Sequence, residues 1–424
     1  MQEKLTLRYK EGETQIKISR ENLIYAIRPA DLPGIKDEKG SIRESLKNPI
    51  SSAPLSEQVK RGEKVVIIGD DVTRPTPRKR IFPVVLDELN KAGIPDKDIT
   101  VLVALGTHRY MSEKEIEDCY GKKVTERVKV VNHEWEDKTN LVNIGSTLSG
   151  IPVTVNKLAH QADCLIAVGS IVPHCLAGYG GGGKAVQPGI CGWETTGKTH
   201  LLPMYNNEFL KLVGDVENEV RREMEKVAEI VGLNFIINVV LNGRKEIVRV
   251  VSGNQVKAHR EGVKVAKRVY ERKIPGVADI VIVSAYPADI DYWQGLKPLS
   301  YAQHGLREKG TVIFLAPFPD GISPSHSEVE KHADKPYEEI KKLIKENKIE
   351  DLVCASTLLQ HALIMERSEV ICVSDGLSVE QKERLGFRHA GSIEEALEIA
   401  FKKEGKTSKI GVIDFGGDVL PRLQ

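Results

Sequence analysis

Short apolar runs rich in β-branched residues alternate along the chain with stretches of helical period. The strands predicted in the first part are Val65–Gly69, Ile99–Leu105, Val128–Val131, Val153–Val155, Cys164–Val168, Phe235–Leu241 and Ile247–Val251. The helices predicted between and after them are Arg78–Lys91, Ser112–Cys119, Val216–Val231 and Asn254–Lys273. This alternation predicts right-handed βαβ units and mainly parallel sheets that are buried on both faces.

A turn signal at Ile274-Pro275-Gly276 marks the predicted domain boundary. Beyond it we predict the strands Ile280–Ala285, Thr311–Ala316, Glu369–Ser374 and Ile410–Ile413, and the helices Pro298–Leu306, Lys335–Lys345, Ser356–Glu366, Val379–Leu385 and Ile393–Lys403. The sequence therefore predicts two α/β domains, residues 1–273 and 274–424, with an active-site cleft between them. The second domain is expected to be Rossmann-like, and the tail from about residue 408 to 424 could instead pack back on the first.

Composition narrows the class of protein. The 424 residues carry 61 Lys+Arg against 60 Asp+Glu, a formal net charge of +1 that argues against a nucleic-acid partner. No apolar run approaches the roughly 20 residues needed to cross a bilayer, and the first residues lack an apolar signal core, so we expect a cytoplasmic protein with no membrane contact. The six cysteines form no C-x-x-C pair, which argues against a disulfide framework and a structural zinc site.

Candidate chemistry follows the predicted strands, because ligands of open α/β sheets bind beyond the carboxyl ends of the strands. Asp71 and Arg74 follow the strand Val65–Gly69, and His108 follows Ile99–Leu105. Arg74 can grip a carboxylate or phosphate in a bidentate fork, and Asp71 can orient a neighbouring base. A histidine at a strand end is placed to exchange protons near neutral pH.

The most unusual stretch runs from His174 to Lys184 and contains four successive glycines. Such a run is entropically costly and indicates close approach of the backbone to a phosphate or a flat ligand. The stretch fits G-x-x-x-x-G-K, but Ala185 replaces the Ser or Thr that would bind magnesium in a phosphate loop. Lys184 is a candidate for covalent attachment, because a desolvated lysine is a nucleophile.

Two further groups complete the candidate site. His200 is an imidazole ligand suited to nickel, copper or zinc, yet no second ligand stands beside it, so a prebuilt cofactor would have to supply the remaining ligands. After the strand Ile280–Ala285, Trp293 offers an apolar wall, and Gln294 and Lys297 offer donors to a small polar anion.

Taken in order, these motifs resemble the nickel-pincer lactate racemase family over essentially the whole chain. The shared motifs are D-x-x-R (Asp71, Arg74), G-T-H (His108), P-H…G-G-G-G-K (His174, Lys184), the later His200, and W-Q-x-x-K (Trp293, Gln294, Lys297). The resemblance implies an isomerase, a racemase or epimerase of a 2-hydroxy acid that works by hydride transfer through a bound 2-oxo acid. It also implies a nickel cofactor derived from pyridinium-3,5-bisthiocarboxylic acid mononucleotide, and separate maturation enzymes that build it.

The resemblance assigns roles residue by residue. Lys184 would carry the cofactor covalently, His200 would ligate nickel, and His108 and His174 would form the acid/base pair. The residues assigned to the substrate are Arg74, Gln294, Lys297 and Trp293, and those assigned to the cofactor are Asp71, Thr73, Gly180, Gly181, Gly182 and Gly183. Two departures leave the particular 2-hydroxy acid open, lactate or a relative such as a sugar acid: Trp293 replaces a tyrosine, and no tryptophan occurs near residues 358–360.

Two alternatives remain at this point. A phosphate-loop enzyme would use the Gly-rich stretch on a nucleotide, which Ala185 and the histidines oppose. A non-catalytic protein would bind a small acid or carry the cofactor, although a binder needs no acid/base pair. The sequence does not indicate an oligomeric state.

Overall fold

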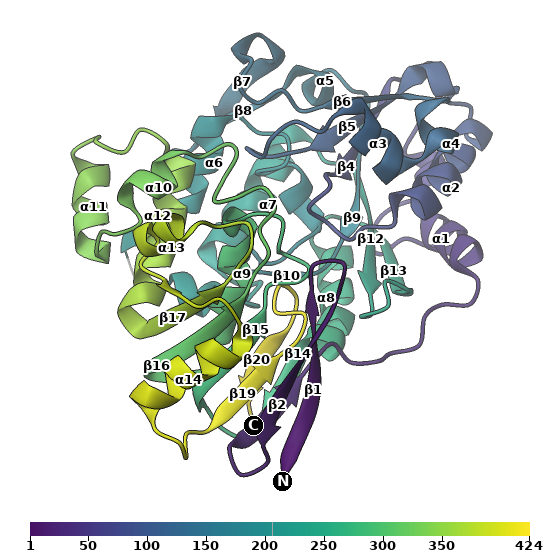
Figure 1. The fold of residues 1–424 in the computed structure, drawn as a ribbon. Coiled ribbons are helices and arrows are strands. Elements are labelled where there is room, and N and C mark those ends of the chain that lie inside the picture. Colours follow the sequence, from purple (N-terminus) through teal and green to yellow (C-terminus); the bar gives the residue numbers. More distant parts are fainter. Residues whose placement is uncertain (206) are drawn as a thin grey trace.

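The computed structural model describes residues 1–205 and 207–424, and its two largest sheets each have six strands (Figure 1). The first sheet has the order β13-β12-β9-β4-β5-β6. Its strands are β4 (Val65–Asp70), β5 (Ile99–Ala104), β6 (Lys129–Asn132), β9 (Cys164–Ser170), β12 (Phe235–Leu241) and β13 (Ile247–Gly253). All neighbours pair in parallel except β12 and β13, which pair antiparallel.

Side chains of the first sheet alternate between two cores. Val65 and Ile67 face one core and Val66 and Ile68 face the other, as the period of two along a strand requires. The first core is covered by α1 (Glu38–Lys47), α2 (Arg78–Lys91), α3 (Glu113–Tyr120) and α4 (Lys122–Thr125). The second is covered by α5 (Lys157–His160), α7 (Glu219–Val231) and α8 (Lys257–Tyr270). Both faces are therefore buried, which explains the nearly continuous apolar runs in the sequence.

The second sheet has the order β18-β17-β16-β15-β19-β3 and is parallel throughout. Its strands are β3 (Leu23–Ile27), β15 (Ala278–Ser284), β16 (Leu306–Leu315), β17 (Ser368–Val373), β18 (Arg388–His389) and β19 (Ile410–Ile413). One face meets α9 (Tyr292–Ala302), α10 (Glu328–His332), α11 (Tyr337–Lys345), α12 (Leu352–Arg367) and the region of α13 (Val379–Arg384). The other face meets α14 (Ile393–Glu404) and the hairpin of β1 (Gln2–Tyr9) and β2 (Gly12–Ser19).

The two sheets do not divide the chain at a single point. β3 comes from the N-terminal segment but pairs with β19, and Leu7 of β1 lies in the core of the second sheet. β14 (Glu271–Ile274) pairs in parallel with β20 (Leu420–Leu423), so the end of the chain lies beside the predicted boundary (Figure 1). The division of the chain into two domains, residues 1–273 and 274–424, therefore stays a prediction.

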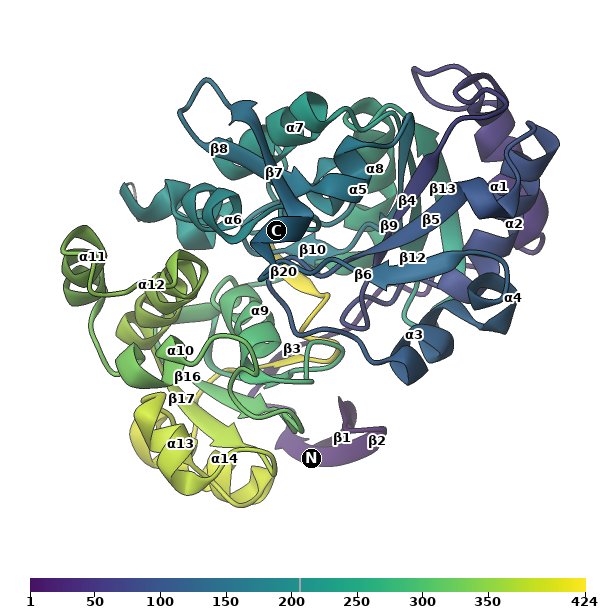
Figure 2. The same cartoon turned by 90° about the horizontal axis from the view of Figure 1, so that it is seen from above.

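Smaller elements join the sheets near the cleft. They are the antiparallel pairs β7 (Leu141–Ser146) with β8 (Pro152–Asn156) and β10 (Pro173–His174) with β11 (Gly178–Tyr179), and the helix α6 (Trp193–His200). Helix α6 of the first half packs against α12 of the second half (Figure 2). The two halves of the molecule therefore meet directly beside His200.

The predicted α/β class with mainly parallel sheets is confirmed, and most predicted strands and helices coincide with observed ones to within a few residues. The helix predicted at Pro298–Leu306 is wrong in its start, because α9 begins at Tyr292 and ends at Ala302. Asp291 caps this helix by accepting the Gln294 N–H at 2.8 Å. Trp293, Gln294 and Lys297 thus lie on the first two turns of a helix. No helix in the described part of the chain is long and apolar enough to cross a membrane.

Candidate active site

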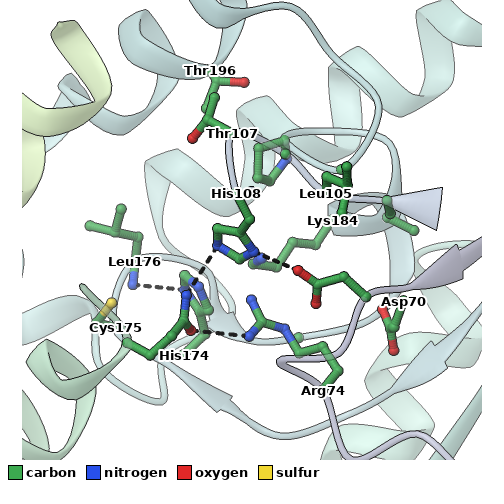
Figure 3. A pocket seen from close by; sticks show the side chains of 18 of the residues that line it. Asp70, Arg74, Leu105, Thr107, His108, His174, Cys175, Leu176, Lys184 and Thr196 are labelled. Carbon is green, nitrogen blue, oxygen red and sulfur yellow. Dashed lines mark hydrogen bonds and ion pairs between the residues drawn. The ribbon is translucent and has the colours of Figure 1, made fainter. Parts of the chain in front are cut away.

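One cavity of about 110 Å³ lies where the carboxyl ends of β4, β5 and β9 face α9 and α12. The predicted site residues that line it are Asp71, Arg74, His108, His174, Gly180, Gly181, Lys184, His200, Trp293, Gln294 and Lys297. Figure 3 shows His108, His174, Lys184 and Arg74 converging on this space from separate segments of the chain. Thr73, Gly182 and Gly183 are not among the lining residues.

Asp71 fixes the ring of His108. Its Oδ2 lies 2.6 Å from His108 Nδ1, while its Oδ1 accepts the Thr73 hydroxyl at 2.6 Å. Burial alone would raise the pKa of Asp71, but the attraction of His108 and Arg74 holds that pKa well below its usual range. A carboxylate only accepts, so the His108 proton belongs on Nδ1 and the Nε2 lone pair faces Gln294 and the cavity.

Gln294 joins the two halves of the site. Its amide nitrogen lies 3.1 Å from His108 Nε2, and its Oε1 accepts from Arg74 Nη1 at 3.3 Å and from Lys297 Nζ. Burial and the nearby Arg74 lower the pKa of Lys297 to about 7. Two cations therefore aim N–H groups at one oxygen, an arrangement that suits a carboxylate.

His174 has the opposite arrangement of ring nitrogens. It is 9% exposed, and its Nδ1 accepts the backbone N–H groups of Leu176 and Ala177, each at 3.2 Å. The neutral ring therefore carries its proton on Nε2. Protonation of Nδ1 is disfavoured, because that nitrogen already accepts two backbone N–H groups. Burial, followed by the charges of Lys184, Lys297, Arg74 and His200, lowers the pKa of His174 well below its usual value.

His200 ends α6 with one ring nitrogen engaged. Its Nδ1 donates to the carbonyl of Thr196 at 2.8 Å, which leaves the Nε2 lone pair for a ligand. Burial, together with the charge of Lys184, lowers the pKa of His200 to about 4, so the ring is neutral at pH 7. Within residues 1–205 and 207–424, no group of three or more His, Cys, Asp or Glu side chains could hold a metal ion. A metal at His200 would therefore take most of its ligands from another molecule.

Lys184 lies among like charges. Burial and the neighbours Arg74 and Lys297 lower the pKa of its amine to about 7, so a large fraction is neutral and nucleophilic at pH 7. Burial raises the pKa of the neighbouring Asp70 carboxyl, while Thr76 and the nearby arginines act in the opposite direction. The cavity is therefore cationic overall and favours anionic ligands.

The Gly-rich loop is held from behind by side chains of α7, α8 and β12. Arg221, fully buried, donates to the carbonyls of Tyr179 and Gly181, each at 3.1 Å. His259 Nε2 donates to the Gly180 carbonyl at 2.8 Å, and Asn238 Oδ1 accepts the Gly182 N–H at 2.8 Å. These bonds fix the carbonyl groups of the loop.

Glycine is required within this loop. Gly182 has a φ of +59°, and a Cβ there would come within 2.5 Å of Arg221 Nη2. The hydrogen bonds to Arg221, His259 and Asn238 depend on the three-dimensional arrangement of α7, α8 and β12, and the sequence carries no local signal for them. Further cavity residues missed by the sequence analysis include Ser170, Thr196, Asn238, Val353, Thr357 and Gln360.

Comparisons with known proteins agree over most of the chain. Residues 9–211 match the lactate racemase N-terminal domain, and residues 274–420 match the lactate racemase C-terminal domain. The chain is 32% identical to a lactate racemase of Lactiplantibacillus plantarum over 90% of this chain and 91% of the relative. It is 30% identical to a lactate racemase of Thermoanaerobacterium thermosaccharolyticum over 91% of each chain.

Solved structures give the same result. The lactate racemase apoprotein from Thermoanaerobacterium thermosaccharolyticum superposes with a TM-score of 0.87 at 29% identity, covering 99% of this chain and 100% of that one. A protein from Thermotoga maritima shares the fold with a TM-score of 0.73 at 20% identity, over 91% of this chain and 98% of that one.

Proposed function

Because the chain belongs to the lactate racemase family, we propose that it is a nickel-pincer-dependent racemase or epimerase of a 2-hydroxy acid. Membership makes the protein a racemase, and so an isomerase, which confirms the family resemblance and the enzyme class predicted from the motifs. The observation that carries the finer proposal is the convergence of two histidines, a third histidine, a buried lysine and a set of carboxylate donors on one cavity.

The residues present fit the proposed cofactor. A metal-binding histidine usually donates its other ring N–H to a carbonyl or carboxylate, as His200 does to Thr196. The pKa of about 7 at Lys184 supports covalent attachment, and Gly180 and Gly181 leave the cavity wall free of side chains for a flat ring. Asp71, Thr73, Gly182 and Gly183 would support this arrangement indirectly, through His108, Arg74 and the fixed loop.

The substrate carboxylate would bind Arg74 and Lys297, with Gln294 beside it. In the ligand-free arrangement both cations donate to Gln294 Oε1, and a carboxylate competes for the same donors with a full negative charge. Trp293 would form the apolar wall next to this clamp. The substrate is then held by its carboxylate, with its hydroxyl group near the histidines.

The two histidines would divide the proton chemistry. When bound, the nickel cofactor would supply a hydride acceptor for the hydrogen on C2. His108 Nε2 takes the hydroxyl proton, and Asp71 stabilises the resulting imidazolium. His174 would donate a hydrogen bond from its Nε2–H to the oxygen of the bound 2-oxo acid and keep its own proton. Return of the proton from His108 Nε2 to the oxygen, and of a hydride to the opposite face of C2, would give the other isomer.

The decisive experiment produces the protein together with cofactor-maturation enzymes and measures intact mass, nickel content and interconversion of 2-hydroxy acid isomers by circular dichroism. We expect a covalent adduct that is lost in Lys184→Ala and retained in the control Lys198→Ala, whose side chain is 43% exposed and pairs with Glu194. A panel that includes lactate and sugar acids identifies the substrate. An adduct-free protein that racemises normally would disprove the cofactor assignment.

The two alternatives are less consistent with the geometry. A phosphate loop runs directly from a strand into an α-helix, whereas residues Gly182–Ala185 form a short 3₁₀ turn and the next α-helix begins at Trp193. A simple binder has no use for two histidines with opposite tautomers. We also propose a cytoplasmic location, which six free cysteines support.

A further inference from the structure

A buried histidine outside the predicted site bridges the two halves of the molecule. His326 is 2% exposed, its Nδ1 lies 2.5 Å from Asp351 Oδ2, and its Nε2 lies 3.1 Å from Thr107 Oγ1. Asp351 can only accept, so it takes the Nδ1–H, and the His326 Nε2 lone pair accepts the Thr107 hydroxyl. Thr107 immediately precedes His108, so this bond holds the turn that carries the proposed base.

All three tryptophans of the chain meet this histidine and its partner. Trp293 stacks on the His326 ring at 4.0 Å between centroids and 15° between planes, and Trp135 lies on it at 6.4 Å and 19°. Trp193 Nε1 donates to Asp351 Oδ1 at 3.2 Å. We refer to His326, Asp351 and these three tryptophans as the tryptophan cluster.

The tryptophan cluster touches the site at several points. Trp293 also lines the cavity, and Trp135 Nε1 donates to the carbonyl of His108 at 3.0 Å. Asp351 also caps α12, the helix that lines the cavity, by accepting the N–H groups of Val353 and Cys354. Trp193 begins α6, the helix that ends at His200. Each contact leads to a residue of the proposed machinery or to an element that lines the cavity.

The cluster also joins parts of the chain that are distant in sequence. Thr107, Trp135 and Trp193 come from the first half, while Trp293, His326 and Asp351 come from the second. The candidate site is likewise split, since His108 and Gln294 approach from opposite halves. Contacts that hold the two halves together here therefore also set the distance between the proposed base and the residues proposed to bind the substrate carboxylate.

We propose that His326, oriented by Asp351, is a positioning residue that holds the Trp293 wall and the Thr107–His108 turn in register across the two halves. This role rests on the proposed function, because it assigns His326 to the alignment of that same site. Groups that orient a catalytic or ligating side chain typically contribute roughly 10- to 100-fold to activity. Errors of about 1 Å in the alignment of reacting groups have costs of similar size.

The test compares His326→Gln and Thr107→Val in the cofactor-loaded enzyme. We expect kcat to fall roughly 10- to 100-fold in His326→Gln and to fall also in Thr107→Val, with smaller changes in KM. Thr107→Ser retains the hydroxyl group and should restore most of kcat. His361→Gln is the matched control, because His361 is equally buried and bonded at both ring nitrogens, but its ring packs on Tyr292 and Phe387 instead of on a tryptophan. It should lose thermal stability and keep kcat.

Tryptophan emission gives a readout that does not depend on activity. Every tryptophan of the chain contacts His326 or Asp351. Removing the stacked imidazole in His326→Gln should therefore change the emission of the apoprotein, while His361→Gln should leave it unchanged. If His326→Gln and Thr107→Val lose stability but keep the wild-type kcat, the inference is wrong. If the loaded wild-type enzyme interconverts no 2-hydroxy acid, the proposed function itself fails.

Discussion

The two histidines proposed as an acid/base pair should respond differently to the same substitution. His108 donates its Nδ1–H to Asp71 and presents a lone pair at Nε2, whereas His174 accepts two backbone N–H groups at Nδ1 and presents an Nε2–H. Glutamine places an amide N–H close to the position of Nε2 but cannot accept a proton there. His174→Gln therefore keeps the group that His174 presents, and His108→Gln does not.

The expected magnitudes follow from these roles. Loss of a general base lowers kcat roughly 10²- to 10⁴-fold. Both His108→Gln and His108→Ala should therefore lose kcat by a factor in that range. Loss of a donor to a developing oxyanion lowers kcat roughly 10²- to 10³-fold, and His174→Ala should lose kcat by a factor in that range. His174→Gln keeps the donor and should be clearly more active than His174→Ala. The ratio of glutamine to alanine variants thus distinguishes the two positions, provided that nickel content is equal.

Nitrogen NMR of ¹⁵N-histidine-labelled apoprotein checks the tautomers without any activity. Long-range ¹H–¹⁵N correlations should place the His108 proton on Nδ1 and the His174 proton on Nε2 at neutral pH. His174 should remain neutral well into acid, because burial and the charges of Lys184, Lys297 and Arg74 lower its pKa. A His174 ring that carries its proton on Nδ1, or becomes doubly protonated near neutral pH, would refute this reasoning, as would equal losses in the glutamine and alanine variants at position 174.

Three other perturbations test the remaining parts of the site. His200→Ala should lose nickel while keeping the adduct on Lys184, as measured by metal analysis and intact mass, and His160→Ala at an exposed position should lose neither. Asp71→Asn offers an amide N–H to His108 Nδ1 and so favours the wrong tautomer, which should lower kcat roughly 10²- to 10⁴-fold at unchanged nickel content. Lys297 has a pKa lowered to about 7, so it is charged below that pH and loses its charge above it. The KM for a 2-hydroxy acid should therefore rise as the pH increases through about 7. Lys297→Ala should have a higher KM that does not change across this pH range. A wild-type KM that stays constant across the range would contradict the assignment.

The sequence predicts the parallel sheets well because their strands are buried on both faces. Val65–Gly69 forms a continuous apolar run for this reason, and its identification needs no knowledge of its neighbours. The N-terminal strands escape prediction because β1 and β2 form a half-exposed hairpin and β3 pairs with β19, nearly 400 residues away in sequence. Pairing over such a separation is decided by the assembled core and leaves no local pattern.

The candidate site is predictable where it follows strand ends and is not where it depends on helix packing. Asp71 and His108 stand directly after β4 and β5, so the geometry of parallel sheets brings them together. The start of α9 was missed because Gly295 and Pro298 weaken its local helical signal; in the fold, Gly295 lies against the Phe318 ring, where an added Cβ would come within 2.3 Å. Arg221 and His326 carry no signal because their roles arise only from contacts between distant segments.

The concentration of positive charge explains why both proposed ligands would bind at the junction of the two halves. Burial, together with the charges of neighbouring cations, lowers the pKa of both Lys184 and Lys297 to about 7, with Arg74 the main neighbour in each case, and Asp71 is committed to His108. Such repulsion destabilises the fold by itself and is relieved when an anion accepts hydrogen bonds from the same groups. Lys184 and Arg74 come from the first half and Lys297 from the second, so an anion that contacts both sides also holds the halves together. Binding of a cofactor phosphate or a substrate carboxylate would therefore strengthen the interface that the tryptophan cluster already aligns.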